Sequence, residues 1–229
     1  MEVLGNYYTH LVKAFPFLMK GAGLTIQITA MSVFFGTIIG LIIGLGRLSP
    51  KKVLSKMSAI YVDVIRGTPL LVQVLIIYFA VPGLMSDILN SPVRFNRITA
   101  AVVACSINSG AYVAEIFRAG IQSIEKGQME AARSLGMSRA QAMRYIILPQ
   151  AFKRVVPPLG NEFIALMKDT SILSVIGVEE LLRKGQIYIA ATYQSSPIYV
   201  GVALVYLVLT LTVSRWVSYT ERRLGVKND

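Results

Sequence analysis

Charged residues are scarce in this sequence. They make up 15% of its 229 residues, whereas a soluble domain carries roughly 25%. Hydrophobic residues make up 54%, and the mean hydropathy of the chain is +0.59. This balance excludes an ordinary soluble protein and indicates an integral membrane protein. The length predicts one domain over residues 1–229.

Cysteine and histidine are scarcer still, with one of each. Cys105 lies in an apolar stretch, so a disulfide framework is excluded. Because His10 is the single histidine, we expect neither a histidine-based metal site nor Ser-His catalysis, and no residue is assigned to catalysis or metal binding. The first 20 residues lack the basic region and unbroken apolar core of a cleavable signal. Their aromatics and lysines predict a short interfacial helix at the membrane surface.

Long apolar runs dominate the rest of the sequence. About 20 apolar residues cross the hydrocarbon core of a bilayer as a helix. The predicted spans are 23–46, 59–81, 98–118, 152–176 and 197–219. The fourth is the weakest by hydropathy because it holds Glu162, Lys168 and Asp169. The predicted fold is therefore an all-α membrane protein with five transmembrane helices.

The lysines and arginines give these spans an orientation. Of the 23 in the chain, fifteen fall in the loops on one side of the predicted spans and six on the other. Basic residues concentrate on the cytoplasmic side of a membrane, so the N-terminus is predicted outside and the C-terminus inside. The net charge of +11 then reports topology, and no nucleic-acid partner is expected.

Small residues and a helix breaker mark the first two spans. Gly36, Gly40 and Gly44 repeat every four residues, a spacing that lets another helix approach closely, although glycine is also simply common in membrane helices. In the second span, Gly67-Thr68-Pro69 interrupts the helix and frees a backbone carbonyl. Broken backbone at this depth is tolerated where it lines a cavity; a plain proline kink is the alternative.

Polar side chains recur within the spans at helical spacing. Such residues are costly in a membrane and usually face a cavity or a partner. On three spans they share one helical face, which predicts a water-accessible path through the bundle. The candidate substrate-binding residues on these stripes and beside them are Asp63, Arg66, Gln73, Asn108, Tyr112, Glu115, Glu162 and Lys168.

Two interpretations of these stripes stay open. Asp63 and Glu115 each stand one helical turn from an arginine, and either carboxylate could form a purely structural pair with it. Asn108 and Glu162 have no obvious local partner, which favours a place on the path. The stripe of Glu162 continues to Asp169, seven residues later. A buried carboxylate without a fixed cation favours a cationic ligand.

The loop at 119–150, predicted inside, is longer and more patterned than a simple connection requires. Its stretch EAARSLGMSRAQAMRYIILPQ favours helix in two pieces, broken by Gly136. Ala131 and Ala132, flanked by Glu130, offer a small flat surface that suits a groove on another protein. An amphipathic helix on the lipid surface is the alternative, and it explains neither the paired alanines nor the glycine.

This loop resembles the cytoplasmic loop of ATP-binding-cassette importer permeases, through Glu130-Ala131-Ala132, Gly136 and Ile147-Leu148-Pro149. Further stretches are similar to the polar amino-acid subgroup, the permeases of histidine, arginine and glutamine type. They are RGTPLLVQ (66–73), GAYVAEIFRAGIQSIEKGQMEAARSLGM (110–137), LPQAFKRVVPPLGNEFIALMKDTS (148–171) and SVIG (174–177). The N-terminal helix and residues 82–97 and 178–196 are not characteristic.

The resemblance implies a permease subunit in a bacterial inner membrane, paired with an identical or related second permease around a central path. It implies a cytoplasmic coupling helix, Glu130 to Gly136, that docks into an ATPase dimer, and an extracellular solute-binding protein that delivers a polar amino acid. The chain has no G-x-x-x-x-G-K-[ST], so ATP and Mg are expected in the separate ATPase. We expect no cofactor and no enzyme activity in this chain.

Glu162 and Asn108 favour a basic amino acid as substrate (arginine, lysine or histidine). Arg66, Lys168 or free backbone amides would then hold the carboxylate of that amino acid. The alternative from another class is an ion-coupled secondary transporter or channel, which would use the same carboxylates as ion sites. Such proteins usually have more spans and need no loop of this kind.

Overall fold

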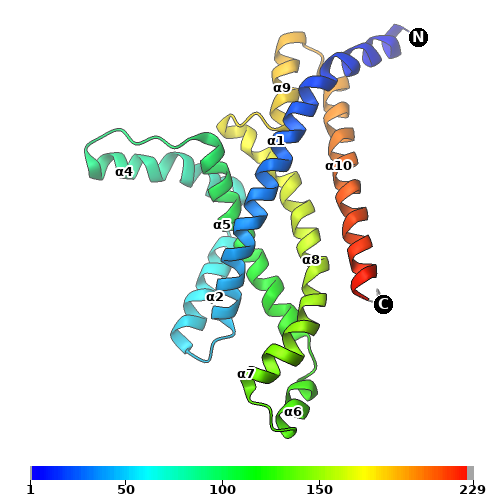
Figure 1. The fold of residues 1–229 in the computed structure, drawn as a ribbon. Helices are drawn as coiled ribbons and strands as arrows, with labels where there is room; N and C mark the ends of the chain where they lie inside the picture. Colours follow the sequence, from blue (N-terminus) through cyan, green and yellow to red (C-terminus); the bar gives the residue numbers. More distant parts are fainter. Residues whose placement is uncertain (1, 226–229) are drawn as a thin grey trace.

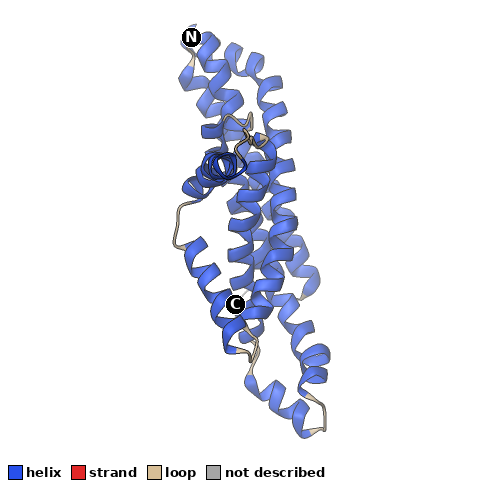
Figure 2. Ribbon diagram, turned by 90° about the vertical axis from the view of Figure 1, so that its left-hand side faces the viewer, coloured by secondary structure: helices blue, strands red, loops and turns tan. Residues whose placement is uncertain are grey.

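One helix, α1, runs the length of the bundle in the computed structural model, which describes residues 2–225 (Figure 1). Residues 1 and 226–229 of the predicted domain lie outside this range. All regular elements between residues 2 and 225 are helical (Figure 2). The α-helices are α1 (Glu2–Arg47), α2 (Lys52–Arg66), α3 (Leu70–Leu75), α4 (Val81–Leu89), α5 (Arg97–Gln122), α6 (Lys126–Ser134), α7 (Arg139–Ala142), α8 (Leu148–Asp169), α9 (Leu181–Thr192) and α10 (Ser195–Leu224). Ile76–Ala80 and Met143–Ile147 are π-helical turns, and Thr170–Ile176 is a 3₁₀-helix.

The predicted interfacial helix over the first 20 residues is not a separate element, because α1 continues from it into the first span. Pro16 lies inside α1 without ending it. Ala14 and Leu18 are buried in one cluster with Leu181 of α9 and Ile198 of α10. This tertiary packing stabilises the helix through the proline, so the predicted helix is the N-terminal part of α1 rather than a separate element; its place at the membrane surface stays a prediction.

The first span packs closely on α5. A Cβ atom added to Gly36 would lie 2.9 Å from Cβ of Ser109, and one on Gly40 would lie 2.5 Å from Cγ1 of Val113. Only glycine leaves room for this approach. The predicted close contact along the glycine stripe is therefore confirmed.

The predicted second span, 59–81, is two helical segments that point in different directions. α2 ends at Arg66, and the segment from Leu70 to Leu89 runs through α3, a π-helical turn and α4. Figure 1 shows α4 projecting sideways from the bundle, and Figure 2 shows it nearly end-on. Because Pro69 has no N–H for the carbonyl four residues earlier, α2 does not continue through it.

Four helical segments of the described chain are long and apolar enough to cross a membrane. They are Tyr7–Arg47, Leu70–Leu89, Arg97–Gln122 and Ser195–Arg223. α8 has 22 residues, a length of about 33 Å, and packs on α5 and α10. Its charged residues lower its hydropathy, as the sequence indicated.

The long loop after α5 forms α6 and α7 at one end of the bundle (Figure 1). Gly136 has a φ of +86°, and this left-handed conformation brings the N–H of Met137 to the carbonyl of Ala132 at 3.1 Å, which ends α6. Ser138 and Gln141 form a reciprocal capping box at the start of α7. The predicted division of the loop at Gly136 is confirmed.

α9 lies at the opposite end of the bundle and is anchored by a buried carboxylate. Glu180 accepts the backbone N–H groups of Leu182 and Arg183, both at 2.8 Å, and the hydroxyl of Tyr206 at 3.0 Å. Its side chain is fully buried, and this burial raises the pKa of Glu180. The three donors stabilise the charged form in the absence of a salt bridge within residues 2–225.

Candidate functional site

A cavity of about 550 Å³ lies where α2, α5 and α8 meet the break before α3. The break itself, residues 66–70, forms part of the wall. Of the two interpretations of Gly67-Thr68-Pro69, the cavity-lining one therefore fits. The polar residues that line the cavity are Arg66, Thr68, Asn108, Tyr112, Glu162 and Asp169.

The break is held by Gln73 of α3, whose side chain is buried. Its Nε2 donates to the carbonyl of Ile65 at 2.8 Å, to the carbonyl of Thr68 at 3.1 Å and to the hydroxyl of Thr68 at 2.9 Å. The carbonyl of Ile65 is the one that Pro69 leaves without its helical donor. Gln73 thus supports the cavity wall from behind, and the structure does not place it among the lining residues.

Asn108 and Tyr112 are the residues of α5 that line the cavity. The Nδ2 of Asn108 donates to Oε1 of Gln73 at 2.9 Å. The guanidinium carbon of Arg66 lies 5.1 Å from the centre of the Tyr112 ring, within the range of a cation–π contact. The structure therefore brings Arg66, Asn108 and Tyr112 together, as the sequence predicted.

The carboxylates of the cavity come from one face of α8. Glu162 and Asp169 both line it, and their seven-residue spacing was the signal in the sequence, although Lys168 rather than Asp169 was predicted as a contact. Lys168 instead lines a separate hollow with Tyr206 and Thr210 of α10. Successive helical residues point about 100° apart, which is why Lys168 does not share the face of Asp169.

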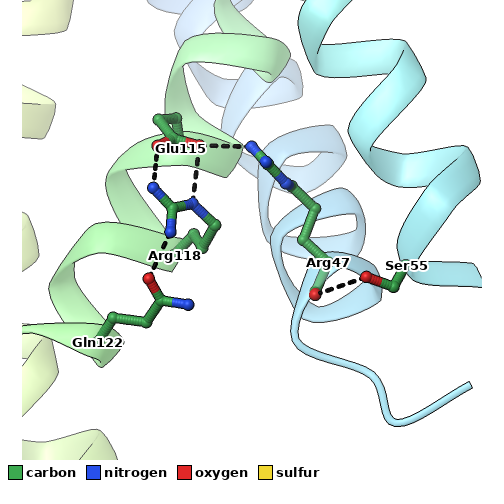
Figure 3. A network of polar contacts seen from close by, with 5 residues as sticks. All are labelled: Arg47, Ser55, Glu115, Arg118 and Gln122. Carbon is green, nitrogen blue, oxygen red and sulfur yellow. Dashed lines mark hydrogen bonds and ion pairs between the residues drawn. The ribbon is translucent and has the colours of Figure 1, made fainter. Parts of the chain in front are cut away.

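Glu115 is held in an ion-pair network (Figure 3) and is not among the residues that line the cavity. Its Oε2 accepts Nη1 of Arg47 at 2.5 Å and Nε of Arg118 at 2.9 Å. A second nitrogen of Arg118 donates to Oε1, and Arg118 also donates to Gln122. Two guanidinium groups occupy this carboxylate and tie α1 to α5, so the interpretation of Glu115 as a structural pair fits better than a substrate contact.

Asp63 lies on an exposed part of α2, outside the cavity lining. Its backbone carbonyl accepts the N–H of Gly67 at 2.9 Å, where α2 ends. Within residues 2–225 its carboxylate forms no ion pair with Arg66, which turns toward Tyr112 instead. The structure therefore supports neither predicted role of Asp63.

The loop presents a second candidate surface. Glu130, Ala131, Leu135 and Gly136 are exposed on it, and we call these four residues the docking face. Ala132, predicted to share this surface, is only 4% exposed and faces inward. Leu135, at the end of α6, is 85% exposed; the sequence pattern missed it because its exposure depends on the turn at Gly136.

The profile of one protein family matches residues 36–226 of the chain. That family is described as "Binding-protein-dependent transport system inner membrane component". This chain belongs to that family. The permease is 44% identical over 213 residues to "Glutamine transport system permease protein GlnP" of Escherichia coli (strain K12), covering 93% of this chain and 95% of the relative. It is 37% identical to "Arginine transport system permease protein ArtQ" of Bacillus subtilis (strain 168), covering 95% and 96%.

Solved structures share the fold of the permease. One described as "Crystal structure of an amino acid ABC transporter with histidines" matches with a TM-score of 0.86 at 47% identity, covering 93% of this chain and 96% of that one. A methionine transporter in an inward-facing conformation matches with a TM-score of 0.74, covering 92% and 97%, and at 20% identity it supports the fold alone.

These similarities identify the protein as an amino-acid permease of the ATP-binding-cassette importers, in a bacterial inner membrane. They confirm the family that the sequence motifs indicated. The relatives are transport components, and in importers of this kind the ATPase is a separate subunit.

Proposed function

We propose that the permease carries a basic amino acid (arginine, lysine or histidine) through the cavity at Glu162 and Asp169. The observation that supports this most directly is the balance of charge, because two carboxylates and one guanidinium line the cavity. Arginine and lysine carry two cationic groups and one carboxylate, as does protonated histidine. Their charges complement those of the cavity.

The lining also supports a defined orientation of the substrate. Arg66 lies at the break and Glu162 and Asp169 lie on α8, and all three line the cavity. We expect Arg66 to bind the carboxylate of the amino acid, and the α8 carboxylates to accept from its ammonium and its side chain. Charge-assisted hydrogen bonds of this kind are the stronger ones in proteins. The volume falls in the range of roughly 300–1,000 Å³ that small-molecule sites occupy.

Glutamine is the second candidate, since a relative at 44% identity is named as a glutamine permease. Its side chain is neutral, so one carboxylate of the cavity would keep no counter-charge. Two unit charges about 4 Å apart interact by ~4 kcal/mol at an effective dielectric of about 20, and desolvation offsets part of this gain. We expect a net preference for a basic amino acid of about 10- to 100-fold, at ~1.4 kcal/mol per tenfold. The similar structure described with histidines supports this choice.

We further propose five spans with the N-terminus outside, with α8 as the fourth in chain order and the second divided by the break before α3. The length of α8 suffices for a span, and its carboxylates face the cavity rather than lipid. The excess of lysine and arginine in the loops after α1 and α5 and at the C-terminus supports the orientation. The docking face then lies in the cytoplasm, where a dimeric ATPase that binds ATP and Mg would contact it.

The remaining partners follow from the family. A second permease subunit, identical or related, would complete the path, and an extracellular solute-binding protein would deliver the amino acid. In the cycle that we propose, ATP closes the ATPase dimer, the docked loops move with it, and the cavity becomes accessible from alternate sides of the membrane. The permease itself contributes no chemical step.

Binding of radiolabelled amino acids to the purified complex of permease and ATPase tests the substrate. Leaving out the solute-binding protein isolates the preference of the cavity from that of the delivery protein. Arginine and lysine, and histidine at a pH below its ordinary pKa of about 6.5, should compete at concentrations at least about tenfold below that of glutamine. Glu162→Gln should remove most of this preference while the ATPase stays assembled.

Two outcomes contradict the proposal. One is wild-type binding of glutamine as tight as that of arginine, and the other is an unchanged preference in E162Q. Vesicles that hold the permease without the ATPase provide the control for mechanism. Accumulation of amino acid in them on an ion gradient alone would favour the ion-coupled transporter instead.

A further inference from the structure

The missing N–H of Pro69 determines how the side-chain amide of Gln73 is oriented, and Gln73 in turn determines how the side-chain amide of Asn108 is oriented. Pro69 has no N–H, so the carbonyl of Ile65 cannot receive its helical hydrogen bond. Nε2 of Gln73 takes that place at 2.8 Å and also meets the carbonyl of Thr68 at 3.1 Å. Carbonyl oxygens only accept, so the Gln73 side chain can face them only with its NH₂ group.

The other end of the Gln73 amide therefore points to Asn108. Its Oε1 needs a donor, and Nδ2 of Asn108 supplies one at 2.9 Å. Each of the two residues is only 7% exposed, so water does not readily replace either partner, and buried polar groups keep such bonds. With its nitrogen engaged, Asn108 keeps its oxygen Oδ1 for the cavity that it lines.

We propose that this relay, from Pro69 through Gln73 to Asn108, sets the hydrogen-bond polarity of the substrate cavity. The Oδ1 of Asn108 is held as an acceptor on the side away from Gln73, while Nδ2 keeps one N–H beyond its bond to Gln73. An oxygen held in this way favours ammonium and guanidinium groups. Gln73 is then a positioning residue that determines specificity without touching the substrate. The inference rests on the proposed function and deepens it, because it concerns the same cavity.

The relay removes a choice that an isolated asparagine would have. A free amide can turn its NH₂ group or its oxygen toward a ligand. Glutamine, whose side chain holds both a donor and an acceptor, can use either face of Asn108. The side chains of arginine and lysine carry donors only and need the oxygen. Freeing Asn108 should therefore weaken the binding of arginine and spare that of glutamine.

Gln73→Met tests this, because methionine fills a similar volume and offers neither the donor nor the acceptor of the amide. Competition binding of arginine and glutamine to the permease–ATPase complex gives the ratio of their affinities. We expect Q73M to lower the preference for arginine roughly three- to tenfold, the effect of one net hydrogen bond, with glutamine changed less than about twofold. Val74→Ala, which alters the buried neighbour of Gln73 on α3, should leave the ratio unchanged.

A second background separates positioning from general support of the wall. Asn108→Asp presents an acceptor to the cavity whichever way it turns, and its other oxygen meets Oε1 of Gln73 without a donor between them. In N108D, Q73M should therefore lower the ratio of arginine to glutamine affinity less than about twofold, or raise it by relieving that repulsion. If Gln73 acts through Asn108, the effect of Q73M differs between the two backgrounds, which is the departure from additivity that marks an interaction between two sites. Equal losses for arginine and glutamine in assembled Q73M, or the same loss of ratio in both backgrounds, would overturn the relay.

Pro69→Ala covers the case in which Q73M does not assemble. It returns an N–H to the carbonyl of Ile65 and so competes with one of the three contacts that hold Nε2 of Gln73. The preference should fall in the same direction by a smaller factor than in Q73M, and an unchanged ratio overturns the proposal. Wild-type preference for glutamine would refute the basic substrate instead. The relay is then judged separately, by whether Q73M changes the ratio differently in the two Asn108 backgrounds.

Discussion

Two neighbouring residues of α8 provide a sharp test of which face of that helix binds substrate. Asp169→Asn removes a carboxylate that lines the cavity. Lys168→Met removes a cation that lies in the separate hollow toward α10. Both substitutions remove one charge and keep a side chain of similar length, one position apart, so each is the matched control of the other.

The expected magnitude follows from the contact that is lost. A hydrogen bond to a charged group contributes about 1.5–3 kcal/mol. Asp169 is not buried, and solvent screens an exposed ionic contact, so we expect the lower end. About 1.5–2 kcal/mol corresponds to a roughly 10- to 30-fold weaker affinity for lysine in D169N. Lys168→Met should change the affinity less than about threefold, because exposed charges away from the ligand contribute less than about 1 kcal/mol.

Equilibrium binding of radiolabelled lysine to the permease–ATPase complex measures both variants, with co-purification of the ATPase as the check on assembly. Glutamine serves as the second ligand, since the loss in D169N should be smaller for a neutral side chain. A loss in K168M as large as that in D169N would refute the assignment of the cavity face. So would an equal loss of lysine and glutamine binding in D169N.

Three further changes have expected outcomes. Gly40→Ala should destabilise the complex by about 1–3 kcal/mol, since its Cβ would lie 2.5 Å from Val113. Gly23→Ala is the control and should not destabilise it, because its Cβ meets no atom within 4 Å. Equal thermal unfolding of the two variants would contradict the close α1–α5 contact. Leu135→Asp should weaken co-purification of the ATPase by at least about tenfold while the permease stays inserted, and normal assembly would remove Leu135 from the docking face. Burial raises the pKa of Glu180, so the contribution of this residue to stability should be fully present below the ordinary glutamate pKa of about 4.3 and be lost as pH rises through the raised value. Glu180→Gln should flatten that pH dependence of thermal unfolding, and an unaltered slope would exclude Glu180 as its source.

Apolar length and glycine spacing were sufficient to predict part of the fold. The spans at 98–118 and 197–219 became α5 and α10 with small changes at their ends, because continuous apolar sequence leaves little alternative to a helix. The stripe from Gly36 to Gly44 predicted a close helix contact, which the structure forms with α5. The partner of that contact could not be read from the stripe, since any helix backbone fits such a groove.

What the sequence could not settle depended on contacts between distant residues. α1 continues through Pro16 because Ala14 and Leu18 pack on α9 and α10, which lie far away in the chain. The pattern of polar residues identified the stripe of Glu162 but not the side of it that faces the cavity, so it named Lys168 in place of Asp169. Orientation about the helix axis is set by the neighbouring helices, which spacing alone does not reveal.

Gln73 shows how a correct signal led to an incomplete role. Its place on a polar stripe marked it as a candidate contact. The structure shows instead that it satisfies the carbonyl of Ile65 and holds Asn108. The proline four residues earlier contained this information, because a freed carbonyl beside a glutamine predicts a local hydrogen bond. The bond to Asn108, 35 residues away, needed the fold.

The loop that holds the docking face joins α5 and α8, the two helices that supply most of the polar side chains of the cavity. α5, with Asn108, leads into α6, and α7 continues through a π-helical turn into α8, with Glu162. Near the loop these helices are in close contact, since a Cβ on Gly120 would lie 2.4 Å from Cγ2 of Val155. Glu162 lies 14 residues along α8, about 21 Å from its start, on a helix that continues through Pro157 and Pro158. A displacement of the loop by the ATPase is therefore expected to move both walls as a unit.

Arg66 also lines the cavity and is charged, but it lies outside the unit formed by α5 and α8. It ends α2, on the other side of the break, and touches the unit through the ring of Tyr112. The bond from Gln73 to Asn108 also crosses this boundary. Motion of α5 and α8 relative to α2 would strain these two contacts, together with the bond from the Tyr61 hydroxyl of α2 to the carbonyl of Ile107 on α5. We expect the group that binds the substrate carboxylate to separate from the groups that bind its cations as the loop moves, which weakens the hold on the amino acid and allows its release.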